Sequence, residues 1–429
     1  MASDSSYQTK SLGLWFQLSD TKLLNEIAKQ TSLHVNYWQF IDNHGERKCR
    51  LMRKASDSLK KLFNKNNDIY DVLDIGLMIP KNEAITKISF YLPLTTDIKS
   101  IQDLSAFFET QKIAAAVFNE NLSVNQSSAD SYLTLKKGKE GNQKTYCLVQ
   151  RLAKDLEGHI SQKALDIEKQ DLGVIISITK DSLKRAFKQK SDDDNAPRYF
   201  RLRIPVLKSQ PNPIIHTISP SDKLINSGYD SIKCIDFRLN ESRLLLDDIE
   251  YEIEDEQGTF ILPVSRIDFL LAAKLQADVV GGSQQFHKSR FLEPSLWKEY
   301  FEDDKKNIHD HIDRGMVVYH WKKTLSDLPQ NKNTGDKHTS PDDMTFFEDF
   351  ITFVKFKERL SNLKLIIKYA LWSFLIGSIG SLIGSLLYSG PPNLSTIASS
   401  WSNFSLTVEP SPETDELKKQ HKDGSDKGG

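Results

Sequence analysis

The sequence predicts an α+β fold, with mainly antiparallel sheet and inserted helices in a cytoplasmic body, followed by one C-terminal transmembrane helix. Several segments alternate apolar and polar side chains at every second position, which is typical of antiparallel strands with one face in water. Shorter segments between them have the spacing of amphipathic helices. Near the C-terminus, residues 369–389 contain no charged side chain. A helix of roughly 20 such residues matches the hydrocarbon core of a bilayer.

Short strands and short helices alternate in the first half of the chain. The expected elements are, in chain order, a strand over residues 12–18, helices over 21–30 and 49–63, strands over 72–80 and 85–94, and a hairpin formed by 131–137 and 144–152. Asp20 precedes the first helix, and its carboxylate is expected to cap the helix N-terminus. The hairpin is predicted because a glycine-containing turn separates two alternating runs.

The alternation is strongest in the second half. In residues 196–206, an apolar side chain at every second position is expected to face the core, while Arg201 and Arg203 face water. Residues 233–242 repeat this pattern, with Arg238 on the outward side. Both segments are therefore expected to be strands of an antiparallel sheet.

Two further elements are expected after these strands. Residues 250–264 predict a hairpin with its turn near Gly258. Residues 265–282 predict a helix, with Ser265 as its N-cap and a glycine pair beyond its end.

The chain is expected to divide into six parts. They are an N-terminal α+β unit (1–195), a strand-rich second unit (196–328), a linker (329–342), an amphipathic juxtamembrane helix (343–364), a transmembrane helix (365–389) and a disordered translocated tail (390–429). Alternatively, the second unit shares one sheet with the first. The juxtamembrane helix is predicted because Phe346, Phe350, Phe353 and Val354 follow helical spacing.

The residues around the apolar run predict its orientation. Trp372 and Tyr388 suit the two membrane interfaces. On the N-terminal side the basic residues expected at the membrane surface are Lys355, Lys357, Arg359, Lys364 and Lys368. On the other side no basic residue occurs before Lys418. By the positive-inside rule, the body should be cytoplasmic and the tail should lie across the membrane.

Small residues form a stripe along the same run. Ser373, Gly377, Gly380 and Gly384 fall on one helical face, and the last two form a GxxxG motif. Small side chains let two helices approach closely, so this stripe predicts homo-oligomerisation through the transmembrane helix.

Composition excludes several classes of protein. The 57 Lys and Arg nearly balance the 58 Asp and Glu, so bulk charge gives no argument for a nucleic-acid partner. The cysteines Cys49, Cys147 and Cys234 form no CxxC unit, which argues against a disulfide framework or a cysteine-based zinc site. The N-terminus also lacks the features of a signal peptide.

One short motif suggests metal chemistry. His309, His311 and Asp313 occur in HDHIDRG. This spacing resembles the HxHxD element of metallo-β-lactamase-type hydrolases, and the resemblance implies zinc ligands at these three positions. The sequence departs from that family because the charged stretch FEDDKKNI precedes the motif, where the family has a hydrophobic strand. A polar surface helix or loop is the competing interpretation.

Cationic side chains suggest a ligand site. Arg201, Arg203 and Arg238 are expected on outward faces of a sheet, and His287 and Arg290 follow a glycine pair. Guanidinium groups suit phosphate or carboxylate ligands. The competing interpretation is ordinary surface residues paired with acids.

The sequence favours a non-enzymatic protein, because no catalytic motif is complete. We expect a membrane-tethered cytoplasmic sensor or scaffold that needs no cofactor. Its expected partners are membrane lipid, an unknown protein or small molecule, and a second copy of the chain. The alternative is a membrane-tethered metal-dependent hydrolase using His309, His311 and Asp313.

Overall fold

The chain divides into two compact units, Met1–Leu360 and Ser361–Gly429, which we call the body and the C-terminal unit. The computed structural model describes residues 10–40, 70–126, 131–139, 141–189, 193, 195–207, 210, 212–218, 230–255, 257–275, 277–282, 286–301, 306–325, 347–359 and 363–389. The helix expected over 49–63, the linker over 329–342 and the tail over 390–429 lie outside these residues.

The described strands of the body form three sheets. The large sheet has the order β17 (Lys288–Phe291), β18 (Met316–Thr324), β15 (Arg266–Lys274), β2 (Ser32–Trp38), β3 (Tyr70–Ile79), β11 (Arg198–Leu207), β8 (Lys144–Gln150), β7 (Tyr132–Lys137) and β6 (Leu122–Gln126), with β5 (Gln102–Asp103) also paired to β11.

The other two sheets are smaller. The cover sheet has the order β14 (Thr259–Ile261), β1 (Gly13–Leu18), β4 (Ile85–Leu92), β10 (Gly173–Ile178) and β9 (Leu165–Gln170). The small sheet has the order β12 (Ile215–Ile218), β13 (Asp230–Leu239), β19 (Phe350–Arg359) and β16 (Ala277–Gly282). Most pairs are antiparallel, and among the described strands only β15–β2 and β11–β8 are parallel. The prediction of an α+β fold with mainly antiparallel sheet is confirmed.

No domain boundary lies near residue 195. The strand β11, which follows that position, is hydrogen-bonded along its whole length to β3, which precedes it. Likewise β14 pairs with β1. The expected division of the body into 1–195 and 196–328 is therefore wrong, and the alternative of a shared sheet describes the body.

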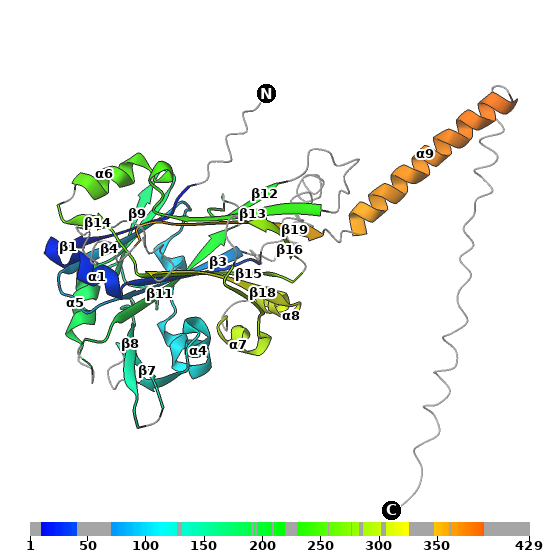
Figure 1. Cartoon of the computed structure of the whole chain (residues 1–429). Coiled ribbons are helices and arrows are strands. Elements are labelled where there is room, and N and C mark those ends of the chain that lie inside the picture. Colours follow the sequence, from blue (N-terminus) through cyan, green and yellow to red (C-terminus); the bar gives the residue numbers. More distant parts are fainter. Residues whose placement is uncertain are drawn as a thin grey trace, which may run out of the picture. The chain divides into compact units, whose positions relative to one another are not determined.

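The body is layered (Figure 1). The main core lies between one face of the large sheet and the inner faces of the cover and small sheets. In the described part of the body the α-helices are α1 (Leu24–Gln30), α4 (Gln111–Phe118), α5 (Lys180–Lys188), α6 (Asp247–Asp255), α7 (Pro294–Glu299) and α8 (Lys306–Asp313). The helix α6 packs on the outer face of the cover sheet. The helices α4, α7 and α8 cover the other face of the large sheet.

The strands at the centre of the large sheet are buried on both faces. In β2, Leu33 and Val35 face the main core, whereas Trp38 packs under the helices on the opposite face. The same holds for β11, whose Arg201 and Arg203 are buried. The expected water-facing side of this strand is therefore wrong, because helices cover it.

Two elements of the second half differ in type from expectation. The segment expected as a helix over 265–282 forms β15 and β16. Its apolar residues occur in a nearly continuous run because β15 is buried on both faces and pairs with β2 and β18. Conversely, the first strand of the expected hairpin over 250–264 is part of α6. Ile249 and Ile253 pack together there at the i, i+4 spacing of a helix.

The expected juxtamembrane helix over 343–364 is also wrong, because its central part is the strand β19. Ten residues of β19 pair with ten residues of β13. Phe350, Val354 and Phe356 lie on one face of the strand and are buried. Lys355 and Lys357 lie on the opposite face and are exposed. This long ladder outweighs the helical spacing of the phenylalanines.

The C-terminal unit contains the helix α9 (Leu363–Ser389). It spans the positions expected to be helical over 365–389 and begins two residues earlier. Among the residues that the structure describes, no helix combines the length and the apolar character needed to cross a membrane.

Candidate functional site on the large sheet

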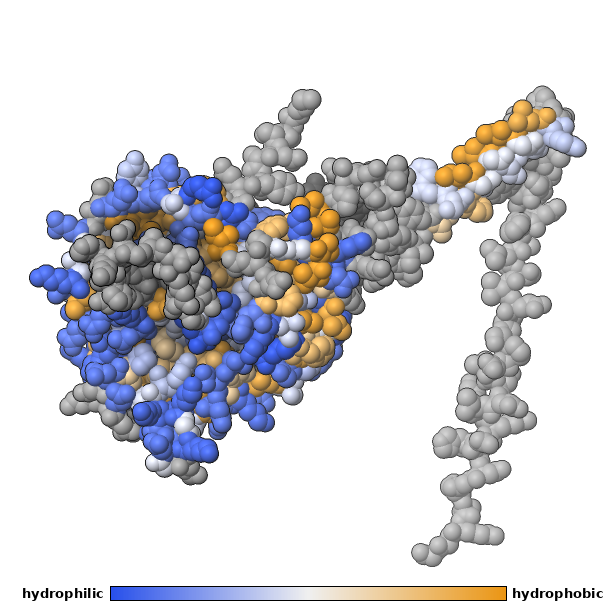
Figure 2. Space-filling model, viewed as in Figure 1, coloured by the Kyte–Doolittle hydropathy of each residue, from blue (hydrophilic) through white to orange (hydrophobic). Residues whose placement is uncertain are grey.

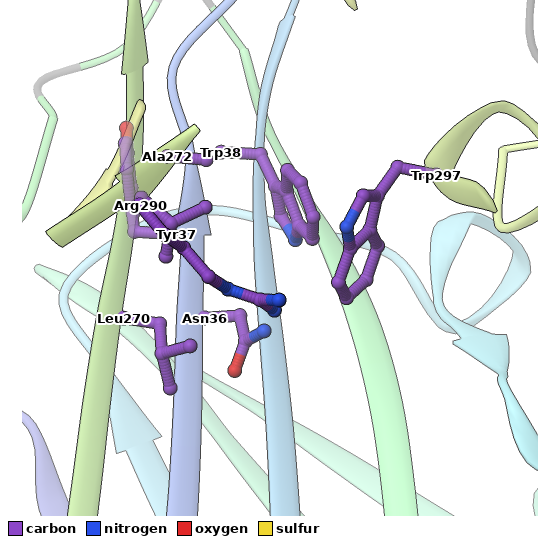
Figure 3. A pocket seen from close by; sticks show the side chains of 8 residues that line it. Asn36, Tyr37, Trp38, Leu270, Ala272, Arg290 and Trp297 are labelled. Atoms are coloured by element: carbon purple, nitrogen blue, oxygen red, sulfur yellow. The ribbon is translucent and has the colours of Figure 1, made fainter. Parts of the chain in front are cut away.

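A small pocket lies on the helix-covered face of the large sheet, where β2, β15 and β18 approach α7 (Figure 3). It is lined by Asn36, Tyr37, Trp38, Leu270, Ala272, Arg290, Trp297 and Val318. Its free volume of about 10 Å³ is roughly that of one water molecule. A larger ligand would therefore have to bind over the rim of the pocket.

The rim carries basic side chains from the edge strand β17. Arg290 reaches over the pocket toward Asn36 (Figure 3) and forms an ion pair with Glu293 at 3.0 Å. Lys288 lies two residues earlier, so it points to the same face of the sheet. Its register partner on β18 is His320. Lys288 and Arg290 are both exposed.

Beside this rim, Asp268 holds two histidines and an arginine. Nε2 of His320 donates to the Asp268 carboxylate at 2.8 Å, and Nε2 of His34 lies 3.5 Å from its other oxygen. Arg266 also donates to Asp268. Burial opposes ionisation of Asp268, but the His320 hydrogen bond and the charges of His34 and Arg266 outweigh it. They hold the pKa of this carboxyl well below its usual range.

The two histidines differ in their access to solvent. His34 is buried, which lowers its pKa to about 4, so its imidazole is neutral at pH 7. Its Nδ1 lies 3.4 Å from the Tyr199 hydroxyl. The His320 side chain is 16% exposed. Because its Nε2 is held by Asp268, this ring is oriented for hydrogen bonding at the surface, and the ring of His287 lies edge-on at 5.7 Å.

A second polar network is fully enclosed between the sheet and α7. Asp74 accepts two hydrogen bonds from Arg203, at 2.8 and 3.2 Å, and others from Trp38 and Tyr300, at 3.0 and 2.9 Å. Arg201 donates to the Tyr199 and Tyr300 hydroxyls. Arg201 and Arg203 are buried in this network, so the expectation that they face water is wrong, and their role in ligand binding stays a prediction.

A glycine makes room for this network. A Cβ at Gly76 would lie 2.0 Å from the Tyr199 hydroxyl oxygen and 3.0 Å from an Arg201 nitrogen. Gly76 is the register partner of Arg201 on β3. A glycine inside a strand often marks a close approach, and this signal was present in the sequence.

The remaining members of the predicted cation site separate into two groups. His287 and Arg290 lie together at the rim of the pocket. Arg238 lies on β13 of the small sheet, where it pairs with Asp236 at 2.9 Å and Glu241 at 2.6 Å. The structure thus brings together only part of the predicted set.

The predicted metal ligands lie on α8 and are not assembled. His309 contacts the Phe301 carbonyl at 3.2 Å, His311 packs on Phe40, and Asp313 pairs with Lys298 at 2.5 Å. His309 and His311 are two positions apart on a helix, so they point to different sides. Within the described part of the chain, no group of three or more metal-type side chains converges.

The residues predicted at the membrane occupy β19 and α9. Lys355, Lys357 and Arg359 belong to β19, and Lys364 and Lys368 lie in the first turns of α9. Ser373, Gly377, Gly380 and Gly384 follow within the same helix. Apart from the backbone of α9 itself, an added Cβ at any of these three glycines would meet no heavy atom of the described residues within 4 Å.

No model of a known protein family matches this sequence, and no curated protein matches it either. The function is therefore inferred from the geometry of the chain itself.

Proposed function

We propose that this protein is a membrane-tethered cytoplasmic sensor or scaffold, whose body binds an anionic ligand or partner over the rim formed by β17 and β18. The observation that carries the tether is the exposure of apolar side chains along α9. Phe374, Ile376 and Leu387 expose 70%, 65% and 84% of their surface. Burying each such side chain is worth about 1.5–3 kcal/mol, which favours a lipid environment.

The sequence supports the same proposal. The uncharged run covers residues 369–389, whereas the side chains that the structure describes in this helix lie between residues 370 and 388. Lys364 and Lys368 precede this run, whereas no cation follows it before Lys418. By the positive-inside rule this asymmetry favours a cytoplasmic body.

Extraction of membranes at high pH tests the tether. The full chain should stay with the membrane in sodium carbonate. A variant with Ile376→Lys and Ile379→Lys should be released, because each lysine near the centre of a span opposes insertion by about 2.5–3.5 kcal/mol. Ser381→Ala is the matched control and should remain in the pellet. Release of the unaltered chain would contradict the tether.

The binding proposal rests on the cations at the rim. Lys288 and Arg290 are exposed side by side, and His320 lies between Asp268 and the surface. Side chains of this kind donate charge-assisted hydrogen bonds to phosphate or carboxylate groups.

Calorimetry with inorganic phosphate and phosphoserine tests this site. Lys288→Ala with Arg290→Ala should weaken binding by about tenfold or more, since a hydrogen bond to a charged group contributes about 1.5–3 kcal/mol. Lys163→Ala removes an exposed cation from the loop before β9 and should leave the affinity unchanged. Equal affinities of all three proteins would contradict the proposed site.

A further inference from the structure

The body carries an exposed apolar surface at one end. We call it the end patch and define it as Leu275, Val279, Val280 and Phe291, whose exposed fractions are 51%, 39%, 63% and 52%. Figure 2 shows apolar side chains gathered over the end of the body where β16, β18 and β19 lie. Apolar residues grouped in this way mark interaction surfaces more often than scattered ones do.

The members of the patch come from three neighbouring elements. A Cβ added at Gly315 would lie 3.1 Å from the Phe291 ring and 3.5 Å from a Leu275 methyl group, so these two side chains converge over Gly315. Leu275 follows the last residue of β15, and β16 begins at Ala277 and continues through Val279 and Val280. The four residues therefore belong to adjoining segments, from β17 through the end of β15 to β16.

The end patch adjoins the end of β19 that leads into α9. Ala277 of β16 is the register partner of Glu358. The strand β19 ends at Arg359, and α9 begins at Leu363. Four consecutive Cα steps separate these two residues, so their Cα atoms are at most about 15 Å apart in any arrangement of the two units.

Basic side chains flank the patch. Arg314 is exposed and precedes Gly315, and Lys357 is exposed on β19 opposite Asp278. Lys274, the last residue of β15, precedes Leu275. Of the nearby carboxylates, Asp313 pairs with Lys298 at 2.5 Å. Apolar side chains bordered by Lys and Arg are typical of surfaces that enter the headgroup region of an anionic membrane.

We propose that the end patch docks on the bilayer into which α9 inserts, with its apolar side chains among the lipid headgroups and with Arg314 and Lys357 on anionic lipid. This inference rests on the proposed tether. Lipid is favoured over a second protein because Arg359, at the end of the strand beside the patch, is separated from the first residue of α9 by at most about 15 Å. Docking would hold the rim of β17, which supplies Phe291 to the patch, at the membrane surface.

A fluorescent label at the patch tests the inference on the full chain. Val280→Cys is made in a Cys49→Ser background, since Cys147 and Cys234 are buried, and is labelled with an environment-sensitive dye. The chain is reconstituted in vesicles of phosphatidylcholine and phosphatidylserine. The emission should shift to shorter wavelength, and spin-labelled lipid should quench it. A label at Leu156→Cys, on the exposed loop before β9, should show neither effect.

The outcomes separate this inference from the tether. A chain that resists carbonate but whose Val280 label remains in water would overturn docking and leave the tether intact. Release by carbonate would instead overturn the tether itself. A third outcome is an emission shift that grows with the protein density in the vesicles and is not quenched by spin-labelled lipid. It would assign the patch to contacts between copies of the chain and would also overturn docking.

Charge reversal gives a second measurement. Arg314→Glu with Lys357→Glu should abolish the dependence of the Val280 emission shift on phosphatidylserine, while Lys163→Glu should preserve it. If the shift keeps the same lipid dependence in both variants, the assigned electrostatic contact is wrong.

Discussion

Two arginines of β11 share one buried carboxylate. Arg203 is paired with Asp74 at 2.8 Å, and Arg201 lies 3.8 Å from the same carboxylate. The Tyr199 and Tyr300 hydroxyls complete much of the hydrogen bonding of Arg201. The network joins β3 and β11 to the residue that follows α7, so it fixes how this helix docks on the sheet. A buried ion pair of this kind adds little by itself, but removal of one partner leaves uncompensated charge.

The first prediction follows from this asymmetry. Asp74→Ala should lower the free energy of unfolding of the full chain by about 3–5 kcal/mol, because two guanidinium groups lose their carboxylate. Urea unfolding followed by tryptophan fluorescence measures this change. Glu157→Ala breaks the exposed pair with Lys99 at 3.1 Å and is expected to change stability by about 0–1 kcal/mol. Similar losses in both variants would show that the Asp74 network is not buried as described.

The second prediction concerns His34. Burial lowers its pKa to about 4, against about 6.5 in an unfolded chain, so between these values the unfolded state binds more protons. The free energy of unfolding should therefore fall as the pH falls from about 6.5 to 4, by about 1.4 kcal/mol per pH unit for this histidine. Asp268 adds to this fall only near the lower end of the window, because its pKa is held low in the folded chain whereas an unfolded aspartate titrates near about 3.9.

The measurement is the slope of stability against pH. His34→Asn should reduce this slope, and the pKa of buried His311 is also lowered, so His311 should account for part of what remains. An unchanged slope in His34→Asn would show that His34 is not held neutral.

At the scale of elements, local patterns predicted several strands and one hairpin close to their observed positions. The hairpin of β7 and β8 and the strands β1, β3 and β4 occur where they were expected. The failures have more than one physical cause. A strand buried on both faces, such as β15, loses its alternation, and its leucines and alanines then favour a helix. In β19, helical spacing competed with alternation, and only the pairing with β13 decides between them.

The third prediction distinguishes the strand β19 from the expected helix. In the helix, Phe353 would lie in the apolar stripe and Phe356 beside it. In the strand, Phe356 is 1% exposed and Phe353 is half-buried. Phe356→Ala should therefore lower the free energy of unfolding by about 3–5 kcal/mol, and Phe353→Ala by clearly less. Thermal unfolding of both variants measures the difference, and the reverse order would favour the helix.

At the scale of the whole molecule, the candidate site depends on contacts that no local pattern contains. Asn36 and His34 come from the first forty residues, whereas Asp268, Arg290 and His320 come from the second half of the chain. His287 and Arg290 could be singled out from the sequence, because they are basic residues that follow a glycine pair. Asp268 could not, since it lay within an expected helix and its partners are far away in sequence. The large sheet brings them together by pairing β15 with both β2 and β18.

The fourth prediction concerns association of whole chains through α9. Among the described residues, and apart from the backbone of α9 itself, no heavy atom lies within 4 Å of a Cβ added at Gly380 or Gly384, so a larger side chain fits within one copy. Leucine also favours a helix more than glycine does. Gly380→Leu with Gly384→Leu should therefore preserve the helix but weaken self-association by about tenfold or more, which is about 1.4 kcal/mol. Energy transfer between labelled full chains in vesicles measures it. Ser378→Leu, which lies on another face of the helix, is the control, and equal energy transfer in all variants would exclude the stripe as the contact.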